Sequence, residues 1–236
     1  DYFLSSKLLE TKDSQKNFSE KLISSNYLPM FFYKPMISKK LQKDEITKKN
    51  VYFCSQSLIK IRPCFDLIVK KILEKDRKAK VLFIKDQNQI FSNKLYERLK
   101  KNLTSNMDRV SFLEQLSEEN YINQCGSASV LLDPLHFGSG NSFYESMFYG
   151  TPTVTMPTNS LKSSVVSGAY KQMKIKNPPV VKNEDEYVDK AVEIANMNEE
   201  TMLNNKNYYS ESANNHLYEN KKFILELEKL LVDVYL

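Results

Sequence analysis

The stretch from Leu131 to Pro152, LLDPLHFGSGNSFYESMFYGTP, holds three of the five glycines in this chain of 236 residues, namely Gly138, Gly140 and Gly150. Glycine carries an entropic cost, and it is used where the backbone must turn sharply or let another group approach closely. Three glycines in one short window therefore predict that a ligand binds there.

The segment GSGNS at 138–142 lies between an apolar run that predicts a strand and a segment that predicts a helix. Free N–H groups and the positive dipole end at such a helix start can hold a phosphate, and Asn141 and Ser142 add small donors. A capping box is the alternative, because Ser142 and Glu145 have the S-x-x-E spacing that satisfies a first helical turn. Spacing alone leaves both interpretations open. Gly150 is expected to end this helix, without a chemical role.

A second cluster, CSQSLIKIRP at 54–63, comes just after another predicted strand. Lys60 is expected to stand in this loop and to reach a phosphate as a point charge. One lysine among 34 basic residues would ordinarily be a solvated surface residue. Its position after a strand is what indicates a role in binding a phosphate, and Gln56 and Ser57 are further candidate ligand contacts in the same loop.

The elements that must position these residues alternate between short apolar runs and amphipathic segments. The predicted strands lie at 51–54, 81–84, 109–112, 130–133 and 153–156, and their near-continuous apolarity suits a parallel sheet covered on both faces. The predicted helices begin at Pro63, surround Leu95 and Leu99, follow a Ser117 cap, and cover 142–149, 161–169 and 188–195. This order predicts an α/β fold, a Rossmann-like doubly wound parallel sheet, whose ligands gather at the carboxyl ends of the strands.

Three regions are expected along the chain. Residues 1–50 form a linker or N-terminal arm with a helical stretch near Asp1 to Glu10, and residues 51–213 form the Rossmann-like domain. Residues 214–236 form a long amphipathic C-terminal helix from Asn214, with Phe223 and Leu231 on its apolar face. If that face is exposed, it favours a homodimer.

Composition excludes several classes of function. The formal charge of +5 comes from mixed basic and acidic residues, which favours a phosphate-bearing small ligand over nucleic acid. No apolar run approaches the ~20 residues of a membrane span. Cys54, Cys64 and Cys125 lack C-x-x-C spacing, and His136 and His216 are far apart, so we expect no disulfide framework, no metal site and a reducing, cytoplasmic location.

Three motifs together resemble a known family. VYFCSQSLIKIRPCFDLIVKKIL, RVSFLEQLSEENY and LLDPLHFGSGNSFYESMFYGTPTVTMP are similar, in that order, to the donor-binding half of the O-linked N-acetylglucosamine transferases. That family includes the Spindly-type enzymes and bacterial relatives associated with tetratricopeptide repeats. The opening DYFLSSKLLE and LPMFFYKP look like the link between the two halves of such enzymes, which makes this chain resemble a fragment with a missing N-terminal half.

The resemblance implies a two-domain glycosyltransferase of the GT-B type. A UDP-sugar, carrying N-acetylglucosamine or a hexose, would lie between the halves and be transferred with inversion to a protein side chain, without a metal or other cofactor. The implied roles are a diphosphate contact for Lys60, backbone contacts to uracil from Leu116, a ring over the nucleoside from Tyr121, a phosphate cradle of Gly140, Asn141 and Ser142, and ribose binding by Glu145. His136 and Gly138 complete the expected nucleotide-binding set.

The sequence also departs from the family pattern. Animal members have His before two threonines where this chain has Gly140, and Asp where it has Glu145; His and arginines near Tyr121 are replaced by Asn123 and Gln124. No general base for an acceptor hydroxyl stands out, and the family draws such groups from the preceding half. A non-catalytic nucleotide-sugar-binding module is therefore the alternative. A UDP-sugar epimerase is a further one, but it would need more carboxylates and histidines than His136 alone.

Overall fold

The computed structural model describes residues 1–235 and contains one five-stranded parallel sheet as its main body. The strands are β3 (Val51–Cys54), β4 (Lys80–Ile84), β5 (Val110–Leu113), β6 (Val130–Leu132) and β7 (Thr153–Val154). Their order across the sheet is β5-β4-β3-β6-β7, with every neighbouring pair parallel. The chain moves outward from β3 in one direction and then from β6 in the other, which confirms the predicted doubly wound sheet.

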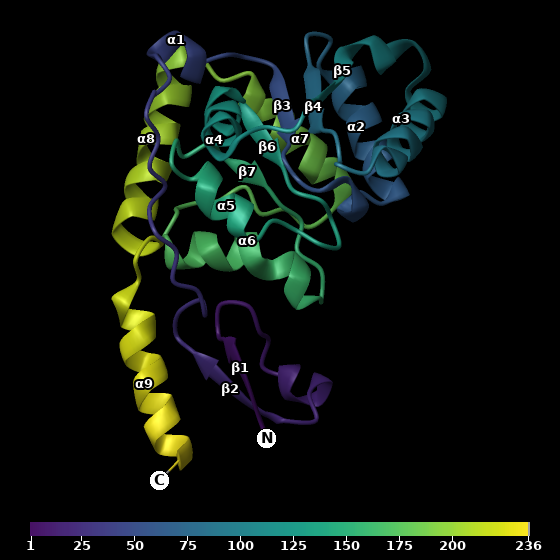
Figure 1. Cartoon of the computed structure of the whole chain (residues 1–236). Coiled ribbons are helices and arrows are strands. Elements are labelled where there is room, and N and C mark those ends of the chain that lie inside the picture. The colour runs from purple at the N-terminus through teal and green to yellow at the C-terminus, as the bar shows by residue number, and fades with distance from the viewer. Residues whose placement is uncertain (236) are drawn as a thin grey trace.

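Helices cover both faces of this sheet (Figure 1). They are α2 (Pro63–Lys75), α3 (Gln89–Leu103), α4 (Glu118–Ser127), α5 (Asn141–Ser146), α6 (Leu161–Gln172) and α7 (Glu184–Ala195). Tyr52 and Cys54 share a core cluster with side chains of α2, α3 and α7, whereas Phe53 and Leu131 pack with Cys125 of α4 on the other face. Successive side chains of a strand point to opposite faces, so continuous apolarity is what a sheet covered twice requires.

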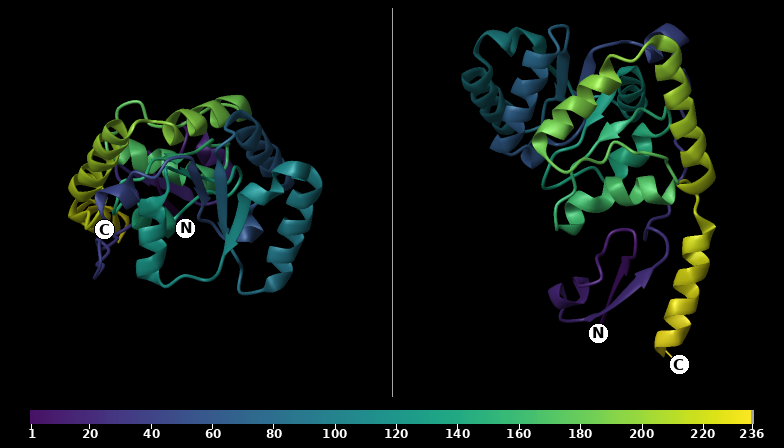
Figure 2. Two further views of the ribbon diagram at one scale, coloured as in Figure 1. Left: turned by 90° about the horizontal axis from the view of Figure 1, so that it is seen from above. Right: turned by 180° about the vertical axis from the view of Figure 1, so that it is seen from behind.

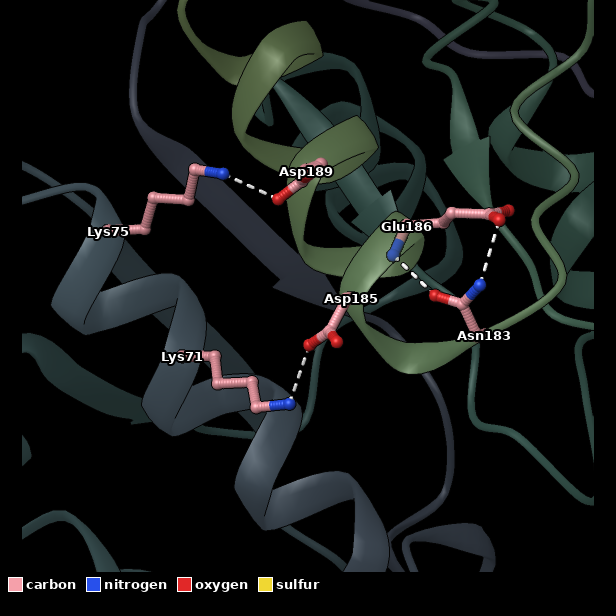
Figure 3. A network of polar contacts seen from close by, with 6 residues as sticks. All are labelled: Lys71, Lys75, Asn183, Asp185, Glu186 and Asp189. Atoms are coloured by element: carbon pink, nitrogen blue, oxygen red, sulfur yellow. Dashed lines mark hydrogen bonds and ion pairs between the residues drawn. The ribbon is translucent and has the colours of Figure 1, made fainter.

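Polar contacts join α7 to α2 at the surface (Figure 3). Lys71 Nζ lies 2.7 Å from Asp185 Oδ1, and Lys75 Nζ lies 2.5 Å from Asp189 Oδ1. Asn183 caps α7 by accepting a hydrogen bond from the N–H of Glu186. Because both ion pairs are exposed, solvent and salt screen them and they add little to the stability of the fold. The apolar cluster beneath them holds the two helices together.

The N-terminal segment differs from the expected helix. Residues Tyr2–Ser6 form strand β1, which pairs in parallel with β2 (Lys21–Ser25) in a separate two-stranded sheet. Helical hydrogen bonding in this segment is limited to a single turn after β1, where the N–H groups of Leu9 and Glu10 both donate to Ser6 O. The prediction of a helix near Asp1 to Glu10 is wrong, because pairing with β2 satisfies more backbone groups than one helical turn can.

The C-terminal part holds two helices in place of one. Helix α8 (Glu199–His216) is followed by α9 (Lys221–Tyr235), and Glu219 between them has a left-handed φ of 48°. The helix expected from Asn214 thus begins at Lys221, and position 214 belongs to α8. The division of the chain into three regions stays a prediction.

Helix α9 leaves the main body and lies beside β2 (Figures 1 and 2), where Glu226 accepts hydrogen bonds from the N–H and side chain of Asn26. Phe223 of its predicted apolar face is buried, whereas Leu231 is exposed. A short helix, α1 (Lys43–Ile46), precedes β3. Within residues 1–235, no helix combines the length and apolarity needed to cross a lipid bilayer.

Candidate functional site

The loops after β3 and β6 meet where the strand order reverses, at the carboxyl edge of the sheet. Lys60, in the loop after β3, donates from Nζ to Gly138 O at 3.2 Å and to Gln56 Oε1 at 2.9 Å. Gln56 in turn donates from Nε2 to Ser142 Oγ at 2.6 Å. The two clusters that the sequence singled out are therefore in direct contact, and Gln56 connects the Lys60 ammonium to the start of α5.

Lys60 borders a hollow of about 440 Å³. The hollow is lined by the loop 137–142 and by side chains at the start of α6, namely Leu161, Lys162 and Val165. Its lining contains cationic, hydroxyl and amide groups but no histidine and no carboxylate. Such a lining suits an anionic ligand.

The start of α5 carries no capping box. Its N-cap residue is Gly140, without a side-chain cap, and Ser142 Oγ is engaged by Gln56. The N–H groups of Gly140, Asn141 and Ser142 donate to no acceptor within residues 1–235. A Cβ built on Gly140 would meet no atom within 4 Å. Of the two interpretations of this spacing, the structure excludes capping and leaves three backbone donors without an acceptor in residues that line the hollow.

Asp133, which the sequence analysis did not select, fixes the shape of the loop after β6. This carboxylate is buried and accepts from Ser139 N at 2.7 Å, from Ser139 Oγ at 2.8 Å and from Thr155 Oγ1 at 2.7 Å. A Cβ on Gly138 would lie 2.7 Å from Asp133 Oδ2, so this glycine is required for the loop to pass over the carboxylate. The sequence signal that could have identified Asp133 is its position directly after an apolar strand and before a glycine-containing loop.

The charges beneath the hollow influence one another. Burial lowers the pKa of the half-buried Lys60, while the charge of Asp133 acts in the opposite direction. Burial raises the pKa of Asp133, and its hydrogen bonds from Thr155 and Ser139 oppose that rise. The ammonium of Lys60 also lies 4.5 Å from the ring centroid of Phe137, an aromatic side chain that the sequence analysis did not select. Lys60 is thus partly desolvated and held in place on the wall of the hollow.

The residues expected to hold the nucleoside lie around the start of α4. Leu116 is half-buried in the loop before that helix, and Ser117 caps the helix as predicted by accepting from Asn120 N. The hydroxyl of Tyr121 donates to Ser55 O at 3.4 Å. Burial raises the pKa of Glu145, and Glu118 adds to the rise; the charge of Glu145 also raises the pKa of Tyr121. The Glu145 carboxyl makes no capping hydrogen bond at the start of α5.

Two predicted residues lie apart from this hollow. Ser57 lines a second hollow of about 270 Å³ between the ends of β3 and β4 and donates to Asp86 Oδ2 at 3.4 Å. His136 is exposed, with Nε2 3.8 Å from Cys64 Sγ, and it lines neither hollow. In the part of the chain that the structure describes, no cluster of three or more metal-ligating side chains occurs. The binding roles of all these residues stay predictions.

Comparison with known proteins gives a family match over most of the chain. The sequence model described as Glycosyl transferase family 41 matches residues 8–227. No curated protein matches the sequence significantly.

Solved structures resemble the fold at low sequence identity. A mutant of Thermobaculum terrenum O-GlcNAc transferase superimposes with a TM-score of 0.83 at 19% identity, covering 98% of this chain and 44% of that one. S. aureus TarM, in complex with fondaparinux, a GlcNAc-glycerol and UDP, gives 0.64 at 14% identity, covering 96% and 43%. Pneumococcal O-GlcNAc transferase GtfA, in complex with UDP and GlcNAc, gives 0.58 at 12% identity, covering 100% and 45%. The chain thus spans less than half the length of these structures.

Proposed function

This chain belongs to glycosyl transferase family 41, and we propose that it is the donor-binding half of an inverting glycosyltransferase that uses a UDP-sugar. The observation that carries the proposal is the contact of the Lys60 ammonium with the loop that presents the free N–H groups of Gly140, Asn141 and Ser142. The complexes of S. aureus TarM and of pneumococcal GtfA both contain UDP, which supports the choice of donor.

The chemistry assigned to this hollow is stabilisation of a leaving group. When a sugar departs from a diphosphate, negative charge develops on the departing oxygen. Donors already aimed at that oxygen lower the barrier, by about 3 kcal/mol for one well-placed group in a dry site. Lys60 supplies the full charge and the amides of 140–142 supply hydrogen bonds. In this proposal the diphosphate is neutralised without a metal.

The nucleoside would extend from the hollow toward α4. Leu116 offers backbone atoms to the uracil, Tyr121 lies beside the nucleoside, and Glu145 accepts the ribose hydroxyls. The carboxyl of Glu145 is suited to this role because it makes no capping bond and is half-buried. The sugar, N-acetylglucosamine or a hexose, would then point out of the hollow.

The acceptor and the general base belong to a part of the enzyme other than this hollow. We propose a protein side chain as acceptor, bound by a preceding half with tetratricopeptide repeats, and a cytoplasmic location in keeping with three free cysteines. The exposed Leu225, Leu231 and Val232 on α9 support association of two copies through this helix.

A UDP titration of the purified chain tests the donor proposal. We predict that Lys60→Met weakens UDP binding by about tenfold to a hundredfold, because one hydrogen bond to a charged group contributes about 1.5–3 kcal/mol. Lys229→Met, which removes an exposed lysine of α9, is the matched control and leaves the affinity unchanged. Calorimetry that detects no UDP binding by the unmodified chain at millimolar ligand refutes the proposal.

A non-catalytic nucleotide-sugar-binding module is the second candidate. It is favoured by the lining of the hollow, which includes no histidine or carboxylate that could act as a base. The two functions are separated by joining the chain to an upstream half and measuring sugar transfer. Transfer that requires Lys60 supports the enzyme, and UDP binding without any transfer supports the module.

A further inference from the structure

A second lysine lines the same hollow as Lys60. Lys162, at the start of α6, has its Nζ 5.4 Å from the ring centroid of Phe137, and Lys60 Nζ lies 4.5 Å from the same centroid. Two points at 4.5 and 5.4 Å from one centroid are no more than about 10 Å apart. Phe137 is 45% exposed, Lys162 is exposed and Lys60 is half-buried, and all three line the hollow.

The position of Lys162 is unfavourable for the stability of the chain alone. It lies in the first turn of α6, which contains no acidic residue and has no side-chain cap at Ser160. A cation there opposes the positive end of the helix dipole, which is unfavourable. Among residues 1–235, Lys162 takes part in no ion pair, and the carboxylate of Asp133 beneath the loop is buried and already accepts three hydrogen bonds. Attraction to the Phe137 ring acts in the opposite direction.

The backbone nevertheless holds Lys162 firmly against the loop after β6. Gly138 N donates to Lys162 O at 3.0 Å, which joins the two walls of the hollow. The turn before α6 is tied by Ser163 Oγ, which accepts from Thr158 N at 2.9 Å and donates to Ser160 O at 2.8 Å. The Lys162 side chain is therefore carried on a turn fixed by hydrogen bonds, and it lines the same hollow as residues 140–142.

We propose that Lys162 is a second cation for the donor diphosphate, taking one phosphate while Lys60 takes the other, with both ammonium groups beside the Phe137 ring. This inference rests on the proposed function of the hollow. A diphosphate carries anionic oxygens on two phosphorus atoms, so two flanking ammonium groups each find a partner. In the absence of ligand, the ring attracts both cations and holds them near each other despite their like charge.

The test compares Lys162→Met and Lys162→Arg with the unmodified chain, using UDP, UMP and uridine as ligands. We expect Lys162→Met to weaken UDP binding about fivefold to tenfold, since the side chain is exposed and its contact is screened. Uridine binding stays within about twofold, and the loss for UMP is smaller than the loss for UDP. Arginine restores UDP affinity, and the methionine variant shows a weaker dependence of UDP affinity on salt. Lys229→Met is the control for loss of one charge.

The outcomes distinguish a failure of the second cation from a failure of the proposed donor-binding function. If Lys162→Met binds UDP as tightly as the unmodified chain while Lys60→Met does not, the second cation is refuted and the proposed function stands. Equal losses of affinity for UDP and uridine would mean that Lys162 has a structural role, which also refutes the second cation. A loss of affinity seen only with a UDP-sugar would mean that Lys162 contacts the sugar, and it refutes the second cation as well. If the unmodified chain binds no UDP, the proposed function fails first.

Discussion

Gly138 and Gly140 lie two residues apart but have different reasons to be glycine. Gly138 passes over Asp133, with no room for a Cβ, whereas Gly140 has open space on the side where a Cβ would stand. One glycine therefore shapes the loop, and the other keeps the free amides accessible. The sequence singled out both without separating these reasons, because a buried carboxylate under a loop is a tertiary feature.

This difference gives a matched pair of variants. Gly138→Ala is expected to destabilise the chain by about 1–3 kcal/mol, because its methyl group would overlap the Asp133 carboxylate. Gly140→Ala is expected to change the free energy of unfolding by less than about 0.5 kcal/mol and yet to weaken UDP binding, because its methyl group enters the hollow. Urea unfolding and UDP titration of both variants measure the two effects. Equal destabilisation by the two substitutions would contradict this assignment.

The site residues themselves were predicted to different degrees. Lys60 and the 138–142 loop were identified because each follows a predicted strand, and parallel strands end at one edge of the sheet. Phe137 and Lys162 were missed, because nothing in the sequence shows that the fold brings their two segments together at one hollow. His136 was expected near the nucleotide and lies outside the hollow, against Cys64.

At the scale of elements, helix α8 is attached to the main body through hydrogen bonds of a buried lysine. Lys206 is 1% exposed, and its Nζ donates to the carbonyl oxygens of Ile46 at 2.8 Å, Gly126 at 2.7 Å and Ala128 at 2.7 Å. It thus joins α8 to the end of α4 and to the segment before β3. Gly150, with a φ of 68°, lets the turn after α5 reach the backbone of α8, because a Cβ there would lie 2.0 Å from Lys206 O.

Removing this ammonium is expected to be costly. Lys206→Met leaves three buried carbonyl groups without a donor, which predicts a loss of at least about 3 kcal/mol in the free energy of unfolding. Lys229→Met, on the exposed side of α9, is the control and should change it by less than about 0.5 kcal/mol. Chemical unfolding of both variants checks the prediction. A similarly small effect for both would show that the three hydrogen bonds of Lys206 do not stabilise the fold.

The same residue predicts a pH dependence. Burial lowers the pKa of Lys206 from 10.5 to about 7, although its three acceptors favour the charged form. Between these two pH values the unfolded chain binds more protons at this residue than the folded chain does, so this group makes stability rise with pH. The rise should be absent in Lys206→Met, and unfolding curves from pH 7 to about 9 would detect it.

Helix α8 also marks a limit of sequence interpretation. Met202, Lys206, Tyr209 and Ala213 are its buried residues and have helical spacing, but a lysine in the stripe interrupts the apolar pattern. The five strands were predicted within one or two residues because their apolar runs are continuous. Strand β1 was predicted as a helix because its partner β2 lies 19 residues further along, and no local sequence pattern indicates that the two strands pair.

At the scale of the whole molecule, the two ends of the chain come together away from the main sheet (Figure 2). The β1–β2 sheet and α9 lie side by side, joined by Asn26 and Glu226, while the hollow lies at the carboxyl edge of the other sheet. The proposed donor site is therefore built entirely from residues of the main body. Its binding of a diphosphate can be tested on this chain alone.

The central claim is that a diphosphate lies on the amides at the start of α5, beside Lys60. The most direct test is to follow the backbone amide resonances of the chain by NMR as UDP, and separately uridine, is added. The account predicts that the amide signals of Gly140, Asn141 and Ser142 shift strongly with UDP and little with uridine. Largest UDP shifts around Ser57 and Asp86 in the second hollow, with the α5 amides unmoved, would contradict it.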